Sequence, residues 1–396
     1  MDYELLSEVS VYRKDRISSD KVNKENYIST ENMLPNRGGV ESATTVASAK
    51  TFSAYKKGDI LLSNIRPYFK KIWYADKEGG CSNDVLVVKA GKSVDSKFLY
   101  YVLSDNNFFN YSTVTSKGTK MPRGSKNAIM KYWVPDLDLP TQKKIADILS
   151  SYDELIKANN ERIELLEQVA QELYKEWFVR FRFPGYENTK FENRIPEGWN
   201  VVKLGDYVEI KGGKRLPEGK TLCVETTEHP YIRIRDITAS KFISLTNSFE
   251  YIDNKTFDII HRFTVNANDI LISIVGTIGA IACVGKSLNG ANLTENCVKL
   301  VNVRHFTNSY LYHFFNSDAG KGAIQAGIVG ATQPKLPLYN IKRIKLLKPN
   351  TDLIVAFTKM IEPIDQEIMT LMDKSRNLTA QRDMLLPRLM SGKLEV

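Results

Sequence analysis

The sequence lacks the residue patterns that mark secreted, membrane-spanning or metal-binding proteins. Its four cysteines, Cys81, Cys223, Cys283 and Cys297, never come near CxxC spacing, and its four histidines form no metal motif. We therefore expect no disulfide framework and no zinc cluster, and reduced thiols favour a cytoplasmic protein. The first residues are acidic where a signal peptide would be basic, and no apolar run reaches the roughly 20 residues of a membrane helix.

Catalytic signatures are missing as well. Gly285-Lys286-Ser287 resembles the end of a phosphate-binding loop, but Ala280 stands where that motif needs its first glycine. No glycine fingerprint of a dinucleotide site follows a strand, and no Asn-Pro-Pro-aromatic run suggests methyl transfer to an amino group. No Ser/His/Asp or Cys/His arrangement stands out either. We therefore expect a non-catalytic binding protein that holds no cofactor and no metal of its own.

What the chain does have is length and positive charge. Its 396 residues include 55 Lys and Arg against 46 Asp and Glu, so the formal net charge is +9. Hydrophobic residues make up 42%, which is enough for ordinary packed cores, and the length is typical of two domains. The sequence thus predicts a basic, folded, two-domain chain.

One large unit occurs twice along the sequence. A shift of 212 residues brings residues 99–173 into register with residues 311–385. The matched pairs include Leu99-Tyr100 with Leu311-Tyr312, Gly118 with Gly330, Pro122 with Pro334, Arg123 with Lys335, Ile129 with Ile341, and Asp153 with Asp365. Upstream, residues 59–63 match 269–273 at a shift of 210, and beyond that only pairs such as Tyr27-Ile28 and Tyr231-Ile232 are left. This period is too long for a solenoid, so the pattern indicates a duplicated domain. The N-terminal parts of the two copies have diverged, and their C-terminal parts have stayed similar.

The C-terminal part of each unit is predicted to be a long helix. Its apolar residues recur at alternating steps of four and three, the spacing of a coiled-coil seam. The seam positions are Tyr152, Ile156, Asn159, Ile163, Leu166, Ala170, Leu173 and Trp177 in the first helix, and Ile364, Ile368, Leu371, Ser375, Leu378, Arg382, Leu385 and Leu389 in the second. Each helix could simply pack on its own globular part, but two seams in register favour pairing with each other.

Prolines and glycines predict the boundaries. Residues 139–141 (Leu-Pro-Thr) open the first helix with Thr141 as its N-cap, and residues 183–185 close it. Residues 349–352 open the second helix, and Leu386-Pro387 ends or kinks it. The predicted division is a globular domain over 1–138, a helix over 139–183, a second globular domain over 184–349 and a second helix over 350–396.

The globular parts alternate short β-rich runs with aromatic helical patches, which predicts an α+β fold. The predicted strands are 60–63, 85–88, 270–275 and 298–303, and the predicted helices are 98–103 and 310–315. The apolar stretch 270–284 is split by Gly276-Thr277-Ile278-Gly279, which indicates two buried strands joined by a turn.

The positive charge is concentrated in two windows that hold no acidic residue, one between Asp105 and Asp136 and one between Asp318 and Asp352. The two windows coincide under the shift of 212, and each contains a loop of Gly, small polar residues and Pro, at 117–123 and 330–335. Such loops can bring backbone N–H groups and cations to phosphates, and Arg, Lys or Gln side chains to base edges. One loop alone could be an ordinary solvated loop, but two in register favour DNA binding.

The candidate DNA-contacting residues lie in these loops, just after the first of them, and in three places before them. They are Arg66, Tyr68, Lys70, Lys117, Thr119, Lys120, Arg123 and Lys126 in the first unit, and Arg233, Arg235, Thr277, Thr332, Gln333 and Lys335 in the second. Residues 232–235 alternate Ile and Arg, which predicts a strand that exposes both guanidiniums, although an ordinary polar strand face would look the same.

Three segments carry a family resemblance. Residues 139–149 (Leu-Pro-Thr-Gln-Lys-Lys-Ile-Ala-Asp-Ile-Leu) are followed by the heptads, residues 195–199 read Ile-Pro-Glu-Gly-Trp, and residues 386–392 read Leu-Pro-Arg-Leu-Met-Ser-Gly. Together with the duplication, these segments resemble the specificity subunit of type I DNA restriction-modification enzymes. The first unit lacks the Pro-Glu-Gly-Trp start, and the second helix lacks the Leu-Pro-Thr-Gln run.

The resemblance implies a non-catalytic DNA-binding subunit. Two target-recognition domains would each bind half of a bipartite, asymmetric site in double-stranded DNA, separated by two helices that form an antiparallel coiled coil with internal pseudo-two-fold symmetry. Two modification subunits carrying S-adenosylmethionine and restriction subunits using ATP and Mg would bind to this frame, without any membrane. Residues 152–177 would span about 39 Å as a helix, and half-sites on one face of B-DNA lie ~34 Å apart.

Two other functions stay open at this point. The helices could form an assembly scaffold whose globular domains bind protein, in which case salt would change the affinity little, whereas phosphate binding weakens steeply with salt. The chain could also be an unrecognised nuclease, which would cleave DNA with Mg²⁺ alone.

Overall fold

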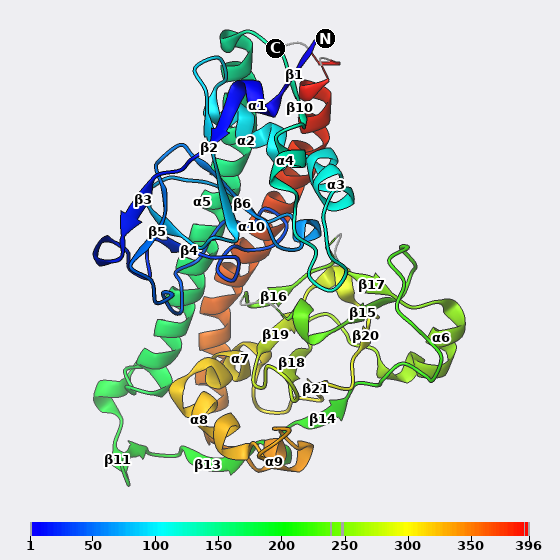
Figure 1. Cartoon of the computed structure of the whole chain (residues 1–396). Coiled ribbons are helices and arrows are strands. Elements are labelled where there is room, and N and C mark those ends of the chain that lie inside the picture. Colours follow the sequence, from blue (N-terminus) through cyan, green and yellow to red (C-terminus); the bar gives the residue numbers. More distant parts are fainter. Residues whose placement is uncertain (1, 238–239, 247–248, 392, 395–396) are drawn as a thin grey trace. The chain divides into compact units, whose positions relative to one another are not determined.

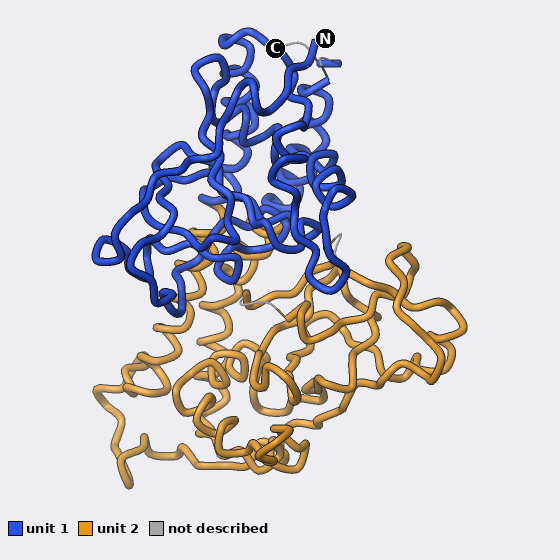
Figure 2. The backbone as a smooth tube through the Cα atoms, viewed as in Figure 1, with its two compact units in different colours: residues 1–158, 374–396 blue, residues 159–373 orange. Residues whose placement is uncertain are grey.

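The computed structural model describes residues 2–237, 240–246, 249–391 and 393–394. The chain divides into two compact units (Figure 2): unit 1 comprises Met1–Ala158 and Lys374–Val396, and unit 2 comprises Asn159–Asp373. Two long helices, α5 (Leu139–Phe178) and α10 (Thr351–Met390), cross this division. Each helix therefore contributes one segment to each unit.

Unit 1 contains two four-stranded sheets and one short strand pair (Figure 1). The first sheet has the order β2 (Ser10–Tyr12), β9 (Val85–Ala90), β6 (Ile60–Ser63) and β7 (Ile72–Tyr74). The second has the order β3 (Arg16–Ser18), β5 (Thr51–Tyr55), β8 (Gly79–Cys81) and β4 (Tyr27–Ile28), and the pair is β1 (Tyr3–Leu5) with β10 (Trp133–Pro135). Its shorter helices are α1 (Leu6–Val9), α2 (Ser96–Ser104), α3 (Asn106–Val114) and α4 (Lys126–Ile129).

Unit 2 repeats this plan with variations. Its larger sheet has the order β14 (Glu209–Gly212), β21 (Cys297–Val301), β18 (Ile270–Ser273), β19 (Ile281–Val284) and β16 (Phe242–Ile243). The smaller sheet is β17 (Glu250–Tyr251), β15 (Pro230–Ile232) and β20 (Asn292–Leu293), and the pairs are β13 (Asn200–Lys203) with β22 (Lys345–Lys348) and β11 (Phe191–Glu192) with β12 (Ile195–Pro196). Its helices are α6 (Asn254–Ile260), α7 (Asn308–Asn316), α8 (Asp318–Gly327) and α9 (Leu338–Arg343).

Hydrogen bonds confirm the duplication beyond the segments where the sequence shows it clearly. The amide of Leu6 donates to the carbonyl of Tyr132 at 2.9 Å, and the amide of Leu204 donates to that of Ile344 at 2.8 Å. The weak match of Tyr27-Ile28 with Tyr231-Ile232 is also structural, because β4 pairs in parallel with β8 in unit 1 and β15 pairs in parallel with β20 in unit 2. The predicted α+β fold of two repeated globular units is confirmed.

In each unit, the sheet that contains β6 or β18 packs on the helix that follows it, α2 in unit 1 and α7 in unit 2. In unit 1, Asp95 caps α2 by accepting from the amides of Lys97 and Phe98 at 3.0 and 2.9 Å. This cap starts a helix whose Phe98 and Leu99 are fully buried, in one core with Ile60, Leu86 and Val88 from β6 and β9. The predicted strands 60–63 and 85–88 and the predicted helices 98–103 and 310–315 are all present, whereas the predicted strand 270–275 ends at Ser273 in β18 and the predicted strand 298–303 ends at Val301 in β21.

The two long helices pair along the predicted seam. Every predicted seam position is buried or half-buried. Within unit 2, Arg162 of α5 forms an ion pair with Glu367 at 3.0 Å, while Trp177, farther along α5, packs on Phe357, which comes earlier in α10. The numbers rise on one helix as they fall on the other, so the predicted antiparallel pairing is confirmed.

The ends of the long helices differ from the predicted ones. Thr141 is not the N-cap of α5, because the carboxylate of Asp138 accepts from the Thr141 amide at 3.0 Å and caps a helix that begins at Leu139. The helix α5 ends at Phe178, before the predicted residues 183–185. The helix α10 continues through Pro387 to Met390, since the buried Leu386 and Leu389 hold this turn in the core of unit 1. Gly392 of the predicted C-terminal motif lies outside the described residues.

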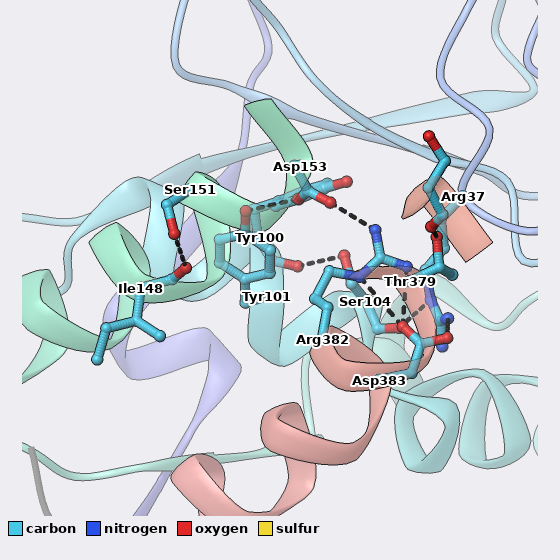
Figure 3. A network of polar contacts seen from close by, with 11 residues as sticks. Arg37, Tyr100, Tyr101, Ser104, Ile148, Ser151, Asp153, Thr379, Arg382 and Asp383 are labelled. Carbon is cyan, nitrogen blue, oxygen red and sulfur yellow. Dashed lines mark hydrogen bonds and ion pairs between the residues drawn. The ribbon is translucent and has the colours of Figure 1, made fainter. Parts of the chain in front are cut away.

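A polar network joins α2, α5 and α10 inside unit 1 (Figure 3). The carboxylate of Asp153 accepts from the Tyr101 hydroxyl at 2.6 Å and from the guanidinium of Arg382 at 2.5 Å. Arg382 also donates to Asp383, which in turn lies 3.6 Å from Arg37. Burial alone would lower the pKa of Arg382, but Asp153 and Asp383 raise it above its ordinary value. Arg382, a polar residue in the seam, is thus the charged partner of the Asp153 carboxylate.

No helix in the described part of the chain is long and apolar enough to span a membrane.

Replacing Arg382 with alanine is expected to lower the free energy of unfolding by about 2 kcal/mol, because the half-buried Asp153 carboxylate loses its charged partner. Urea unfolding followed by circular dichroism measures this change. Arg388→Ala removes an exposed arginine from the same helix and should cost less than about 0.5 kcal/mol. Equal losses in the two variants would contradict the assigned role of Arg382.

Candidate nucleic-acid interface

The two predicted basic loops are closed by the same backbone hydrogen bonds. In unit 1, Lys117 and Arg123 exchange two N–H to C=O bonds, both of 2.9 Å. In unit 2, Val329 and Lys335 exchange two bonds of the same length. The loops connect α3 to α4 and α8 to α9 (Figure 1). The sequence repeat of 212 residues is therefore a repeat of backbone geometry at this site.

Each loop packs against the segment that follows an inner strand of a sheet, β6 in unit 1 and β18 in unit 2. The amide of Gly124 donates to the carbonyl of Asn64 at 3.0 Å, just after β6, and the amide of Leu336 donates to the carbonyl of Ile274 at 2.9 Å, just after β18. Single bridges link Ile65 to Arg123 and Val275 to Lys335. The shift for these strand ends is 210, so the two-residue insertion lies between the sheet and the loop.

Glycine is needed where each loop turns. Gly118 has a φ of 94° and Gly330 a φ of 93°, a conformation that residues with a Cβ rarely adopt. A Cβ on Gly330 would also lie 2.8 Å from the carbonyl oxygen of Gln333, whereas the nearest atom to a Cβ on Gly118 would be 3.6 Å away. The positive φ at this position explains why both copies of the repeat have glycine there.

In unit 1, the structure brings the predicted residues of two segments together. The Arg66 amide donates to the carbonyl of Pro122 at 2.8 Å and so holds residues 66–70 against the loop. The exposed members of this group are Tyr68, Lys117, Thr119, Lys120, Arg123 and Lys126. Two of the cations have protein partners, since Arg123 lies 3.2 Å from Asp84 and Lys70 donates to Asn106 at 2.8 Å. The acid-free window of the sequence did not reveal the ion pair of Arg123, because Asp84 lies outside that window.

In unit 2, Thr332, Gln333 and Lys335 are exposed on the loop, and Thr277 is exposed on the turn between β18 and β19. The bridge from Val275 to Lys335 brings this turn to the loop. Sequence reasoning missed Tyr339 on α9, which is 56% exposed and packs on Arg343 at 5.6 Å. The spacing of four residues between an aromatic ring and a cation on a helix was the signal that could have revealed the pair.

The prediction for Arg233 and Arg235 is wrong in its local structure. The strand β15 ends at Ile232, and Ile234–Asp236 forms a 3-10 helix. The Arg233 side chain is only 16% exposed and is held by Asp236 and Glu250, and Arg235 lies 3.3 Å from Glu250. This segment borders the turn after β18, because Ile234 lies 3.4 Å from where a Cβ on Gly276 would be. Two acids thus offset the charge of both arginines.

Burial keeps three cysteine thiols and one histidine uncharged. Burial raises the pKa of the thiols of Cys81, Cys283 and Cys297 to about 12, so they stay protonated at neutral pH. Burial lowers the pKa of His313, which therefore stays neutral. Within the described residues, no group of three or more His, Cys, Asp or Glu could hold a metal ion.

Known proteins share this arrangement. A family model described as "Type I restriction modification DNA specificity domain" matches residues 6–168 and again residues 196–382. The Type I restriction enzyme MjaIX specificity subunit of Methanocaldococcus jannaschii is 25% identical, over 76% of this chain and 70% of that protein. The Type I restriction enzyme HindI specificity subunit of Haemophilus influenzae is 22% identical, over 86% and 87% of the two chains.

A solved structure has the same fold. The crystal structure of a Type-I restriction-modification system S subunit from M. genitalium aligns with a TM-score of 0.53 at 17% sequence identity, covering 98% of this chain and 96% of that chain.

Gly330→Ala is expected to destabilise the second loop by about 2 kcal/mol, since the new Cβ meets a carbonyl oxygen in a disfavoured conformation. Amide hydrogen exchange over residues 329–335, measured by mass spectrometry, should become faster. Gly118→Ala is the matched variant, and with only the conformational strain it should cost about 1 kcal/mol. A slower or unchanged exchange in Gly330→Ala would show that the loop does not depend on this turn.

Proposed function

Because this chain belongs to the specificity subunits of type I restriction-modification systems, we propose that it recognises a bipartite, asymmetric target in double-stranded DNA and directs modification and restriction subunits to it. The observation that carries the proposal is the pair of identically closed loops, one in each unit, at the end of a central strand. Each loop lies in a stretch of sequence with no acidic residue, between Asp105 and Asp136 or between Asp318 and Asp352.

The chemistry of the loops fits DNA better than protein. Lys117 and Lys120 in unit 1 and Lys335 in unit 2 are exposed beside backbone turns and polar side chains. Such cations neutralise phosphates and release counterions, while Arg, Gln and Thr side chains at the same place can bond to base edges. The exposed cations would thus fix the position on the duplex, and the neighbouring side chains would select its sequence.

The two units would select different sequences. Their loops share a backbone, but Lys120 and Arg123 stand in the first where Thr332 and Lys335 stand in the second. Different side chains on the same backbone present different donors and acceptors to the base pairs. Two unlike half-sites make an asymmetric target.

The methylation and cleavage would belong to partner subunits. We propose that two modification subunits carrying S-adenosylmethionine methylate adenine at the target, and that restriction subunits use ATP and Mg for cleavage. This chain would contribute the choice of site, in the cytoplasm, where the DNA lies. Its own residues would hold the duplex and need no chemistry at the reacting atoms.

Alanine substitutions should weaken the two half-sites separately. Lys120→Ala with Arg123→Ala is expected to weaken binding through one half-site, and Gln333→Ala with Lys335→Ala through the other, because each pair lies in a different loop. Loss of a side chain that contacts a base should cost about 1–3 kcal/mol of binding free energy, and loss of each phosphate contact should reduce the slope of log affinity against log salt by about 1. Fluorescence anisotropy with labelled duplex at several salt concentrations measures both quantities.

The control is a triple variant, Lys21→Ala, Lys24→Ala and Lys255→Ala, which removes as many charges as the fourfold variant from exposed sites outside the loops. It should bind like the unmodified chain. Equal DNA binding by the fourfold loop variant at every salt concentration would contradict the proposed function. An affinity that hardly responds to salt would instead favour a scaffold that binds protein.

A further inference from the structure

One backbone position in front of each loop carries very different residues in the two units. Arg66 follows Ile65, which bridges to Arg123, and Gly276 follows Val275, which bridges to Lys335. Both residues have a positive φ, 50° for Arg66 and 73° for Gly276. The two positions are therefore equivalent, and the fold requires a left-handed backbone there in both units.

Arg66 adopts this conformation at a cost. A residue with a Cβ loses roughly 1–2 kcal/mol in the left-handed region, where glycine loses almost nothing. The surroundings hold it there, because its amide donates to Pro122 at 2.8 Å and its carbonyl accepts from Phe69 at 3.0 Å. Backbone strain of this kind is concentrated at binding and catalytic sites. Gly276 avoids this strain at the equivalent position of unit 2. The presence of arginine in unit 1 therefore needs an explanation in the side chain itself.

The Arg66 side chain has no protein partner for its buried part. Its Nε and the Oδ1 of Asn64, two residues earlier, are both buried without a hydrogen bond among the described residues. A buried polar atom left unpaired costs roughly 1–3 kcal/mol. Two neighbouring cations differ, since Arg123 is paired with Asp84 and Lys70 with Asn106. Among the described residues no acid forms an ion pair with Arg66, whose backbone lies where the loop meets the sheet.

We propose that Arg66 determines specificity in the half-site of unit 1 by donating two hydrogen bonds to O6 and N7 of a guanine. This inference rests on the proposed function. The planar guanidinium matches the two acceptors of guanine in the major groove, a match that a flexible lysine ammonium cannot make. Unit 2 has no side chain at the equivalent position, so its half-site has no guanine fixed by this route.

The test selects DNA targets with the full-length chain from a pool of random duplexes, followed by sequencing. The unmodified chain should yield two conserved half-sites. Arg66→Gly, which copies unit 2 and accepts the left-handed backbone without strain, should keep both half-sites but lose the guanine preference at one position of one of them. Its affinity for the original target should fall about 5- to 150-fold, the value of one bidentate contact to a base.

Two further variants separate base recognition from charge. Arg66→Lys keeps the charge but not the planar fork, so it should also lose the guanine preference. Arg16→Ala removes one arginine from β3 of the same unit, where its guanidinium bonds to Thr51, and should select the original target. An unchanged target for Arg66→Gly would overturn the role of Arg66 and leave the proposed function intact. Loss of the whole half-site, rather than of one base pair, would also count against it, and no selected target for the unmodified chain would overturn both proposals.

Discussion

One aspartate on each long helix ties that helix to the globular part around it, and the rest of each unit is arranged about this contact. In unit 1, Asp153 accepts from Tyr101 of α2 and from Arg382. In unit 2, Asp365 lies 2.6 Å from the ammonium of Lys241 and 3.4 Å from the Ser309 hydroxyl of α7. A partly buried carboxylate is costly without a partner, so each pair fixes which face of its helix turns toward the sheet.

The cations that neutralise the two aspartates come from different places. Arg382 belongs to the other long helix, whereas Lys241 comes from the segment before β16 and is almost fully buried against the ring of Tyr312 at 5.0 Å. Burial raises the pKa of Asp365, and Lys241 opposes that rise. The carboxylate has therefore been kept through the duplication while its partner has been replaced. This is a physical reason why the C-terminal parts of the two repeated units still match in sequence and their N-terminal parts do not.

The sequence was informative wherever local pattern decides structure. Short apolar runs predicted β6 and β18, and the repeated Gly118 and Gly330 located the loops, because a positive φ strongly restricts the residue type. The prediction from sequence failed where a nearby polar side chain bonds to the backbone and overrides the local residue pattern. The Asp236 carboxylate accepts from the Arg233 amide at 2.8 Å, which turns the chain into a 3-10 helix where alternation predicted a strand. The pairing of Lys241 with Asp365 was beyond reach, since residues 124 apart in sequence share no local signal.

The separation of backbone from side chain bears on how the two units would recognise different half-sites under the proposed function. The bonds that close each loop use only N–H and C=O groups, so Lys117 can stand where unit 2 has Val329 without any change in closure. The residue type is constrained only where the backbone has a positive φ. These places are the glycine of each loop and the left-handed position before the loop. Even there one unit holds Arg66 and the other Gly276. Under the proposed function, closure of the loop and recognition of the bases use different atoms, so a substitution in one loop should alter its half-site and leave both the fold and the other half-site unchanged.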